Sequence, residues 1–506
     1  MSILAYVFMG IYATCLLYIT LYCVMQFDLL VYYKRGLKSL SPSTGGSLKN
    51  EVDDILPADY VWPMVTVQLP LYNEQYVVER LIDTIAAFDY PKDRFEIHIL
   101  DDSTDETLDI VKRKVEEYKA KGFQIEQILR TVRQGYKAGA LKDGTVFAKG
   151  EFLAIFDADF MPKPDFLKKT VPFFQDPKVG VVQTRWEHIN QNYSLITKLQ
   201  ALQLNVHFTV EQVGRMQGDY FLQFNGTAGV WRKSTIEDAG GWEADTLTED
   251  LDLSIRAQMK GWKIKFLEGI GSPAELPAEM NALKSQQFRW MKGGAETARK
   301  MLPTLWKSKD LTTRQKIHAT QHLFASSVFL FVFATGISSV PLLYYMEEFI
   351  ARGFNKDVFT YFFLGMMSVT SVYFVANIQS PARQKSVADA TVEFFLLFPV
   401  FLSLSMGLSF HNSIAVIEGY LGKKSAFVRT PKFNITNAGD SFMKNKYIIR
   451  KLAPSTIVEG LLALYYIGGI ALGIHLGLYI FLVFHIMLAF GFGAIFFFTD
   501  KHSLNG

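Results

Sequence analysis

Five stretches of this chain contain no Asp, Glu, Lys or Arg, and they constrain its fold more than any other feature of the sequence. The stretches are 3–27, 317–346, 358–382, 394–417 and 460–499. A helix rises about 1.5 Å per residue and the hydrocarbon core of a bilayer is about 30 Å thick, so about 20 apolar residues can cross it. Stretch 460–499 is about twice that length, which predicts two helices that turn near His475 to Gly477. The sequence therefore predicts an integral, multi-pass membrane protein.

The charges between these runs predict how the chain is threaded through the membrane. The first run has no basic segment before it and no small-residue cleavage site, so we expect it to be a retained anchor. A basic cluster at 34–38 follows it, which predicts a cytosolic location for residues 34–316 by the positive-inside rule. The basic loop 419–451 should also face the cytosol. We therefore predict that 394–417 is a re-entrant or interfacial helix and that five helices cross fully.

These features divide the chain into five predicted regions. They are an N-terminal transmembrane anchor (1–33), a cytosolic domain (50–310), a transmembrane hairpin (311–382), an interfacial helix with a cytosolic loop (383–452) and a C-terminal transmembrane hairpin (453–506). Both cysteines, Cys15 and Cys23, lie in the anchor, so the cytosolic domain cannot depend on disulfides or thiolate metal sites. The net charge of +3 gives no indication of a nucleic-acid partner. A bacterial plasma membrane and a eukaryotic Golgi or plasma membrane are both compatible with this organisation.

Between the first two apolar runs, segments typical of strands alternate with segments typical of helices. The predicted strands are Met64–Leu69, Phe95–Leu100, Gln124–Leu129, Phe152–Phe156, Gly180–Gln183 and Trp262–Leu267. Helical stretches such as Glu74–Phe88 and Glu106–Lys121 separate most of them. This alternation predicts an α/β domain with a mostly parallel, Rossmann-like sheet covered on both faces. In such sheets, ligands bind beyond the carboxyl ends of the strands.

Acidic pairs follow two of the predicted strands at those carboxyl ends. Asp101 and Asp102 come after the second strand, and Asp157 and Asp159 come after the fourth. Two carboxylates two positions apart can share a hard divalent cation that also binds phosphate oxygens. Such a metal neutralises the charge that develops on a diphosphate leaving group. Turn or helix-capping aspartates would give the same pattern, so both interpretations stand at this point.

Three further motifs each have a functional and a structural interpretation. Asp250, in "TED", could act as a general base, although acids in a first helical turn are also what the helix dipole favours. Lys137, in "GYKAGAL", could bind a phosphate near a helix start or be an ordinary surface lysine. The glycines of "FNGTAGVWR" (224–232) would let the backbone approach a ligand closely, or would simply form a tight turn.

The stretch "KSQQFRWMKGG" (284–294) lies shortly before the second apolar run. It brings Gln286, Arg289 and Trp290, which are well suited to contact small ligands, next to a predicted membrane span. All seven tryptophans lie outside the apolar runs. An indole ring can stack on the apolar face of a sugar while its N–H donates a hydrogen bond, which favours a carbohydrate ligand for Trp290.

The order of these motifs resembles the family 2 glycosyltransferases of the cellulose synthase superfamily. The matching motifs are "LDDSTDET", "GYKAGALKDG", "AIFDADFMPKPDFL", "HFTVEQ", "FNGTAGVWR", "AGGW", "TEDLDLSIRAQMKGWK" and "LPAEMNALKSQQFRW". They look most like cellulose synthase-like mannan or glucomannan synthases and xyloglucan-backbone glucan synthases. The resemblance runs from about Pro63 to Lys307, and the long apolar runs fit it as well.

This resemblance implies a GT-A fold inserted between transmembrane helices and an inverting, processive glycosyltransferase (a β-glycan synthase). The implied reaction transfers a hexose from UDP-glucose or GDP-mannose to a growing β-linked polysaccharide, with Mg²⁺ or Mn²⁺ as cofactor and export through the protein's own channel. The implied partners are the nucleotide sugar, the polysaccharide acceptor and the lipid bilayer; accessory export or cell-wall proteins are compatible with it. The alternatives are a single addition to a membrane lipid and, from another class, a catalytically silent scaffold or sugar transporter.

The resemblance also implies a role for individual residues. The catalytic set is Asp250 as the base, with Glu249, Gln286, Arg289 and Trp290. The nucleotide-sugar set is Pro70, Tyr72, Glu74, Asp101, Asp102, Lys137, Asp157 and Thr430. The acceptor set is Asn225, Gly226, Thr227 and Trp290, and the metal ligands are Asp157 and Asp159. Thr430 belongs to "FVRTPKF" (427–433), which resembles the loop that closes over the nucleotide in this superfamily.

Overall fold

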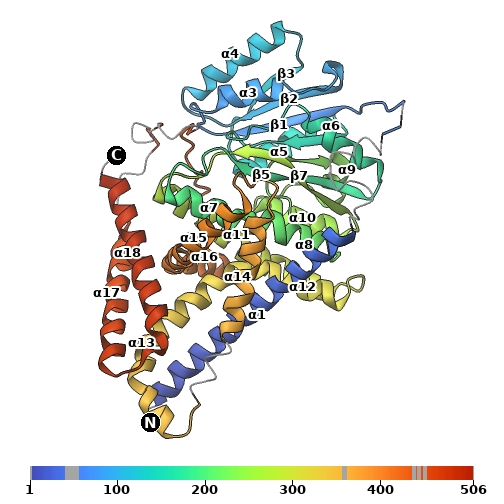
Figure 1. Cartoon of the computed structure of the whole chain (residues 1–506). Coiled ribbons are helices and arrows are strands. Elements are labelled where there is room, and N and C mark those ends of the chain that lie inside the picture. Colours follow the sequence, from blue (N-terminus) through green and yellow to red (C-terminus); the bar gives the residue numbers. More distant parts are fainter. Residues whose placement is uncertain are drawn as a thin grey trace.

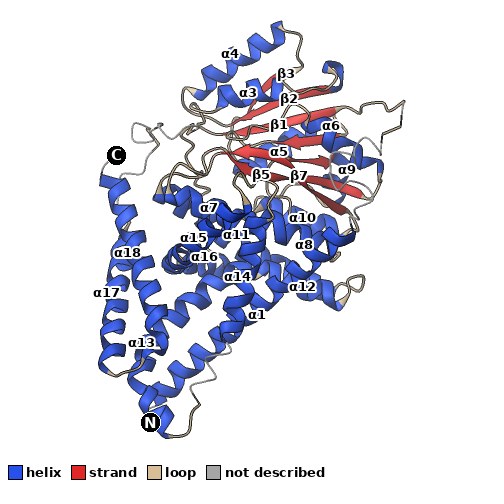
Figure 2. Cartoon of the chain, in the orientation of Figure 1, coloured by secondary structure: helices blue, strands red, loops and turns tan. Residues whose placement is uncertain are grey.

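A seven-stranded sheet forms the centre of the soluble domain (Figures 1 and 2) in the computed structural model, which describes residues 3–39, 56–57, 59–355, 362–435, 440, 446–447 and 453–504. The strands are β1 (Val65–Leu71), β2 (Phe95–Asp101), β3 (Ile125–Leu129), β4 (Phe152–Ile155), β5 (Val179–His188), β6 (Gly229–Arg232) and β7 (Lys263–Ala274). Their spatial order is β3-β2-β1-β4-β6-β5-β7. All six predicted strands are therefore confirmed to within a few residues at most boundaries.

Strand β6 is the one strand of this sheet that the sequence did not predict. It runs antiparallel to both β4 and β5, whereas β1 pairs in parallel with β2 and β4, and β5 pairs in parallel with β7. Its four residues, "GVWR", follow a tight turn directly and are too few for a periodic pattern. The prediction of a mostly parallel α/β sheet is confirmed, with β6 as an inserted antiparallel strand.

Both faces of the sheet are buried, as expected for alternating strands and helices. Val65, Val67 and Leu69 of β1 belong to one apolar core, while Leu153 and Val181 of the neighbouring strands belong to a second core on the opposite face. The covering helices are α3 (Val78–Ala86), α4 (Thr107–Ala120), α5 (Tyr136–Phe147), α6 (Phe166–Thr170), α9 (Lys233–Asp238) and α10 (Glu249–Met259). The carboxyl ends of the parallel strands therefore remain open for a site.

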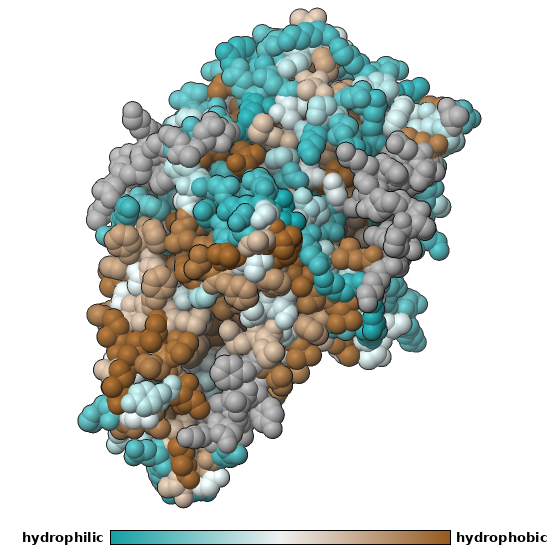
Figure 3. All heavy atoms as spheres, in the orientation of Figure 1, coloured by the Kyte–Doolittle hydropathy of each residue, from teal (hydrophilic) through white to brown (hydrophobic). Residues whose placement is uncertain are grey.

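The region below the sheet consists of helices (Figures 1 and 2). They are α1 (Ile3–Ser39), α7 (Leu195–Asn205), the π-helical turn η4 (Val206–Glu211), α8 (Gln212–Gln217), α11 (Met280–Lys307), α12 (Thr313–Leu323), α13 (Val328–Ala351), α14 (Phe362–Ile378), α15 (Val387–Gly407), α16 (Ser409–Leu421), α17 (Pro454–His475) and α18 (Leu482–Leu504). The face shown in Figure 3 changes from hydrophilic over the sheet domain to hydrophobic over these helices.

Five described helices are long and apolar enough to cross a membrane. The segments are Ile3–Leu37, Ala325–Ala351, Val387–Gly407, Pro454–His475 and Tyr479–Ser503. The predicted division of 460–499 into two helices is confirmed, with a turn that contains Gly477. The candidate spans include Val387–Gly407, whereas the described part of the predicted span 358–382 forms the shorter helix α14. Which helices cross, and in which direction, stays a prediction.

Two predicted boundaries in the membrane region are wrong. The stretch 317–346 is divided among α12, a short 3₁₀ turn and α13, so its long apolar helix begins only near Ala325. The stretch 394–417 is not one helix, because the helical chain breaks between α15 and α16 at Leu408. Gly407, just before that break, lies against Gly491 of α18, and a Cβ atom there would lie 2.4 Å from the Gly491 backbone.

The helix that contains the predicted N-terminal anchor extends beyond residue 33. Helix α1 continues to Ser39, beyond the basic cluster, and rises to the base of the sheet domain (Figure 1). Leu29, Leu30 and Tyr33 of this helix are buried in the second core of that domain. The anchor and the soluble domain therefore share one apolar core.

Candidate active site

One pocket opens at the carboxyl ends of the central strands and contains nearly every predicted site residue. Its lining includes Pro70, Tyr72, Glu74, Asp102, Lys137, Asp157, Asp159, Asn225, Gly226, Glu249, Asp250, Gln286, Arg289, Trp290 and Thr430. These residues come from three strand ends, the starts of α5 and α10, helix α11 and the loop after α16. Of the predicted residues, Asp101 and Thr227 are absent from the lining.

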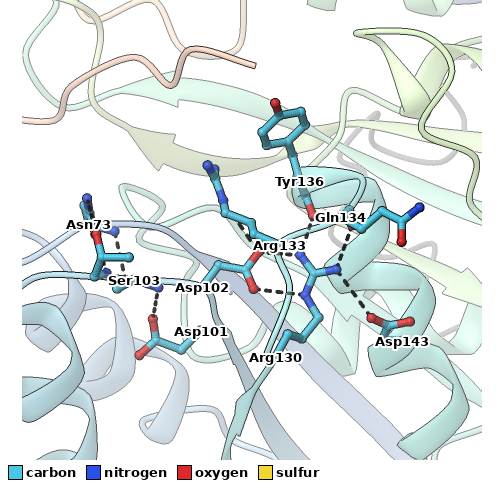
Figure 4. Close-up of polar contacts among 10 residues, drawn as sticks. Asn73, Asp101, Asp102, Ser103, Arg130, Arg133, Gln134, Tyr136 and Asp143 are labelled. Atoms are coloured by element: carbon cyan, nitrogen blue, oxygen red, sulfur yellow. Dashed lines mark hydrogen bonds and ion pairs between the residues drawn. The ribbon is translucent and has the colours of Figure 1, made fainter. Parts of the chain in front are cut away.

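Asp102 lies beside a group of basic residues at the end of β2 (Figure 4). Arg130 donates from Nε to Asp102 at 2.9 Å and is itself oriented by the carbonyl oxygens of Gln134 and Tyr136. Arg133 lies 3.8 Å from the same carboxylate and stacks over the Tyr72 ring, with 3.4 Å between its guanidinium carbon and the ring centre. The arrangement offers a planar cation and an aromatic ring at the pocket wall, which suits a nucleobase.

Asp101, which is also predicted to contact the nucleotide, does not line the pocket in this structure. Its carboxylate accepts the backbone N–H of Ser103 at 3.0 Å, as Figure 4 shows, and the side-chain amide of Gln127 at 2.9 Å. The side chain is 2% exposed. Successive side chains of a strand point to opposite faces, so only one of the two aspartates at the end of β2 can face the site.

The carboxylates of Asp157 and Asp159 are each paired with a lysine. Lys137 of α5 contacts Asp157 at 2.5 Å, and Lys432 contacts Asp159 at 2.6 Å. Burial acts to lower the pKa of Lys137, but the nearby Asp157 and Glu249 outweigh it and raise that pKa above its usual value. The two acids therefore face cations even without a ligand.

Thr227 contacts the backbone of Asp157 and does not line the pocket. Its hydroxyl accepts the backbone N–H of Asp157 at 2.9 Å, and its side chain is fully buried. The hydroxyl of Thr227 thus orients the turn after β4 in this structure, and its predicted acceptor contact stays a prediction. Asn225 and Gly226, its two neighbours in the chain, do line the pocket.

The donor chemistry of Asp157 and Asp159 fits a hard divalent cation. Both residues supply carboxylate oxygens at one end of the pocket, and Asp157 is 37% exposed there. A second acidic cluster, Glu243, Asp245 and Asp252, lies outside the pocket, and Lys300 contacts all three at 2.6 to 3.0 Å. The acids after β4 are the better candidates for a metal that acts on a bound ligand, because they line the pocket and the second cluster does not.

Asp250 occupies the first turn of α10 and faces the turn at Gly226. A Cβ atom on Gly226 would lie 3.0 Å from Oδ2 of Asp250 and 3.5 Å from Nζ of Lys137. Burial, followed by the neighbouring carboxylate of Glu249, raises the pKa of Asp250 to about 7. Burial likewise raises the pKa of Glu249, while Lys137 opposes this shift. A carboxyl group with a pKa near 7 is suited to act as a general base at neutral pH.

Helix α11 presents Gln286, Arg289 and Trp290 to the pocket from one face, because positions three and four apart lie one above another on a helix. The start of the helix is fixed by Glu279, whose carboxylate accepts the backbone N–H groups of Asn281 and Ala282 at 2.8 Å. Burial lowers the pKa of Arg289, and the surrounding acids oppose that shift. The motif next to the membrane therefore reaches the acids of the sheet domain.

The loop after α16 extends over the pocket and contacts it at four points. Arg429 forms an ion pair with Glu74 at 2.8 Å. Thr430 accepts a hydrogen bond from Arg289 at 2.8 Å. Lys432 pairs with Asp159 as described above, and the backbone N–H of Phe433 donates to Glu275 at 2.9 Å. The resemblance of "FVRTPKF" to a closing loop agrees with these contacts.

Three comparisons with known proteins bear on this site. Residues 63–293 match the family described as "Glycosyltransferase like family 2". A glucomannan 4-beta-mannosyltransferase of Arabidopsis thaliana is 34% identical over 410 residues, which cover 79% of this chain and 73% of that protein. The chain belongs to the cellulose synthase-like family 2 glycosyltransferases.

A second curated relative of this glycosyltransferase matches over less of its length, and one solved structure matches over all of it. A probable glucomannan 4-beta-mannosyltransferase of Oryza sativa is 44% identical over 268 residues, and the chain spans about half of it, 49%. A solved mannosyltransferase of Pyrobaculum calidifontis, in complex with GDP-Man and Mn²⁺, is 20% identical with a TM-score of 0.50 and is covered completely, together with 81% of this chain. This structural likeness, together with the topology of the seven-stranded sheet, supports the GT-A fold.

Several pocket residues of this family 2 glycosyltransferase were missed by sequence reasoning. They are Arg133, Trp186, His188, Glu275, Phe427, Arg429 and Lys432. Arg133 lies four positions before Lys137, so the basic residues ahead of "GYKAGAL" were a usable signal. Arg429 and Lys432 lie within "FVRTPKF" itself, where only Thr430 was singled out. No pattern in the sequence indicated Glu275, because the predicted strand ended at Leu267 whereas β7 continues to Ala274.

The close approach at Gly226 predicts a specific loss in a Gly226→Ala variant. Gly226 has φ +78°, and a methyl group would meet the Asp250 carboxylate. Gly241 has φ +79° with open space around it, so Gly241→Ala is the matched control. Both variants should lose about 1 to 2 kcal/mol of stability from the left-handed backbone. Only Gly226→Ala should also lose most of its hexose transfer, measured as nucleotide release in vesicles; equal activity in the two variants would contradict the geometry.

Proposed function

We propose that this protein is a membrane-embedded, inverting β-glycan synthase that adds hexose units from a nucleotide sugar to the end of a growing polysaccharide. The observation that carries the proposal is the composition of the pocket. It contains a carboxyl group with a raised pKa, Asp250, together with a tryptophan suited to stack on a sugar, Trp290. It also contains the acids after β4 and the basic residues that a diphosphate requires.

Asp250 is the base in this mechanism. It removes the proton from the acceptor hydroxyl while that oxygen attacks the anomeric carbon of the donor sugar. The bond from the anomeric carbon to the diphosphate breaks on the opposite side, so the configuration inverts. Trp290 stacks against the terminal sugar of the acceptor, and Gln286 lies on the same helix face to orient it.

The leaving diphosphate is stabilised by cations that converge on the pocket. Lys137 and Arg289 lie close to the acids of the site, and Arg429 and Lys432 approach from the loop after α16. Asp157 and Asp159 would hold Mg²⁺ or Mn²⁺, which when bound neutralises charge on the diphosphate. Positively charged side chains fixed before the reaction stabilise developing negative charge without reorganisation.

The relatives favour mannose as the donated sugar. Each of the curated relatives named above is called a glucomannan 4-beta-mannosyltransferase, and the one of Arabidopsis thaliana is matched over 73% of its length. We therefore extend β-1,4 mannosyl transfer, with GDP-mannose as the donor, to this protein. UDP-glucose remains the second donor to test, because Arg133 and Tyr72 can stack on either base.

Buried polar groups among the membrane helices support export of the product through the protein. The hydroxyl of Tyr466 and both side-chain polar atoms of Asn412 are buried without a partner among the described residues. Such groups are costly in an apolar environment unless they face a polar path or ligand. A polysaccharide supplies many hydroxyl groups, which could satisfy them on its way between the helices.

A donor panel on the full chain in lipid vesicles tests the proposal. GDP-mannose and UDP-glucose are supplied separately, each with and without Mn²⁺ or Mg²⁺, and both nucleotide release and high-mass product are measured. We expect metal-dependent polymer from GDP-mannose. Nucleotide release with only a small lipid-linked product would establish the single-addition alternative instead. No transfer from any nucleotide sugar would overturn the proposal.

Replacement of the proposed base, Asp250, should lower the rate of sugar transfer but leave binding of the donor nucleotide sugar intact. We expect Asp250→Asn to lower the transfer rate by about 10² to 10⁴, the usual contribution of a general base, and to leave nucleotide binding nearly unchanged. The exposed Asp245 lies in the preceding loop, so Asp245→Asn is the control and should retain its activity. Near-normal polymer yield from Asp250→Asn would exclude this role.

The same assignment predicts the pH dependence of transfer. Below a pH of about 7 the Asp250 carboxyl group is protonated and cannot accept a proton, so the rate should rise with pH up to about 7 and then level off. Burial also raises the pKa of Glu74 to about 7, so a Glu74→Gln variant should still show this rising limb at saturating donor. If the rising limb disappears in Glu74→Gln, the pH dependence of transfer belongs to Glu74 and not to Asp250.

Trp290 should matter for the acceptor rather than for the donor. We expect Trp290→Ala to weaken polymer elongation about 10-fold or more, the usual worth of a buried aromatic contact, and to leave hydrolysis of the donor by water largely intact. Trp306 lies on the same helix with its side chain 51% exposed, so Trp306→Ala is the matched control. An equal loss of elongation and hydrolysis in Trp290→Ala would argue against stacking on the acceptor.

A further inference from the structure

A second cavity lies between the sheet domain and the apolar helices below it. It has a volume of about 110 Å³ and is bounded by α7, by the loop 379–386 that connects α14 to α15, and by the first turns of α15. Helices α7 and α15 lie directly below the sheet domain (Figure 1). The cavity shares no lining residue with the active-site pocket, so the proposed reaction does not account for it.

The position of this cavity along the chain matches the surface of a bilayer. Asn205 of α7 donates to Asn377, in the last turn of the apolar helix α14, at 3.0 Å. In the loop that follows, the Ser380 hydroxyl accepts a hydrogen bond from Arg185 of β5 at 2.8 Å. The candidate span Val387–Gly407 begins directly after this loop. The cavity therefore lies where two apolar helices reach the polar domain, which is the level of the lipid headgroups.

The polar part of the cavity carries an excess of positive charge. Lys198, Arg383 and Lys385 line it, and Glu393 of α15 is the one acid among the described residues that do so. Lys385 lies 2.8 Å and Lys198 3.8 Å from the Glu393 carboxylate, so a single acid serves two ammonium groups. Arg383 donates to the backbone carbonyl of Lys385, and no carboxylate of the described residues pairs with its guanidinium group. The cavity is therefore suited to an anion.

The other wall of the cavity is apolar. It is formed by Leu202 of α7 and by Phe394 and Leu397 of α15. The last two share one face of α15, because positions three apart lie one above another on a helix. The neighbouring Phe395 and Leu396 are 60% and 70% exposed, which extends the apolar surface away from the cavity. Positively charged groups and a continuous apolar surface thus meet at one place.

We propose that this cavity binds an anionic phospholipid, with the phosphate among Lys198, Arg383 and Lys385 and an acyl chain along α15. A free phosphate ion would pair with the same bases but would leave the apolar wall without a partner. A phospholipid supplies both parts, and anionic lipids are abundant in the cytoplasmic leaflet, the side on which the sheet domain is predicted to lie. This inference is independent of the proposed function, because it involves no residue of the active-site pocket.

The position of Glu393 makes the charge requirement specific. Its carboxylate competes with a phosphate for both lysines, so Glu393→Gln should bind the lipid about fivefold more tightly. Arg383→Gln and Lys385→Gln should each bind it about fivefold more weakly, the usual worth of one basic residue near an anionic membrane surface. A purely structural role of these side chains would not raise the affinity in Glu393→Gln.

The test uses the full chain in micelles of an uncharged detergent, freed of bound lipid, with phosphatidylglycerol as the probe. Native mass spectrometry measures binding, and thermal unfolding measures the stabilisation that a bound ligand produces. We expect phosphatidylglycerol to bind about tenfold or more tightly than phosphatidylcholine, whose choline group cancels the phosphate charge. Lys309→Gln is the matched control and should bind like the wild type, because Lys309 is an exposed lysine between α11 and α12, outside the cavity.

Four results would overturn the inference. Equal affinity for the two lipids would exclude an anion site, and an equal loss of binding in Lys309→Gln would show only a general attraction to positive charge. Weaker binding in Glu393→Gln would contradict the competition for the lysines. Glycerol 3-phosphate is the remaining arm; if it binds as tightly as phosphatidylglycerol, the cavity takes a free phosphate and not a lipid. Sugar transfer is measured in none of these arms, so a failure of the proposed function leaves the test intact.

Discussion

The pairing of opposite charges within a buried pocket is the interaction on which the rest of this structure depends. Seven acids line it, Glu74, Asp102, Asp157, Asp159, Glu249, Asp250 and Glu275, together with five bases, Arg133, Lys137, Arg289, Arg429 and Lys432. Burial of an unpaired charge costs several kcal/mol, so neither set could be buried alone. The acids belong to the sheet domain, whereas three of the bases come from α11 and from the loop after α16. Most of the positive charge that offsets these acids is therefore present only when the helical region is packed against the sheet domain.

Helix α11 connects the pocket to the other long helices, and buried ion pairs fix the position of α11. Lys284 pairs with Glu459 of α17 at 2.8 Å, and Lys292 pairs with Glu418 of α16 at 3.3 Å. Removal of one partner from a buried pair costs about 3 to 5 kcal/mol, because the other charge remains without compensation. Such pairs therefore tolerate few alternative arrangements of the helices. Arg289, which lies between the two lysines along α11, is held in place relative to both the membrane helices and the pocket.

The sequence predicted the strands and most of the site, because both follow from local patterns. A strand such as β4 is a run of apolar residues, and the acids directly after it must lie at the carboxyl edge of the sheet. Asp101 and Thr227 could not be assigned in this way. Which of two neighbouring side chains faces the site depends on the twist and pairing of β2, and the partner of the Thr227 hydroxyl lies 70 positions away in the chain. The sequence contains the residues but not these orientations.

The remaining differences between prediction and structure share a tertiary origin. The break between α15 and α16 directly follows Gly407, which packs against Gly491 of α18, and Leu29, Leu30 and Tyr33 of α1 are buried in a core of the sheet domain. Arg429 and Lys432 meet acids, Glu74 and Asp159, that lie 355 and 273 positions away in the chain. Each of these features is set by a partner far away in the sequence, which no local pattern records.

The lysine pairs also explain how the pocket could exchange one set of charges for another. Without a ligand, Lys137 and Lys432 neutralise the two acids after β4. In the proposed reaction, a divalent cation on these acids would free both lysines, and the diphosphate would then supply the negative charge that the lysines need. The cation and the diphosphate carry opposite charges of similar size, so the total charge of the buried site would change little. A buried pocket tolerates such an exchange because the desolvation of each new charge is compensated by a partner already in place. Binding of the cation and the nucleotide sugar should therefore be strongly coupled, since either one alone would leave a buried charge without a partner.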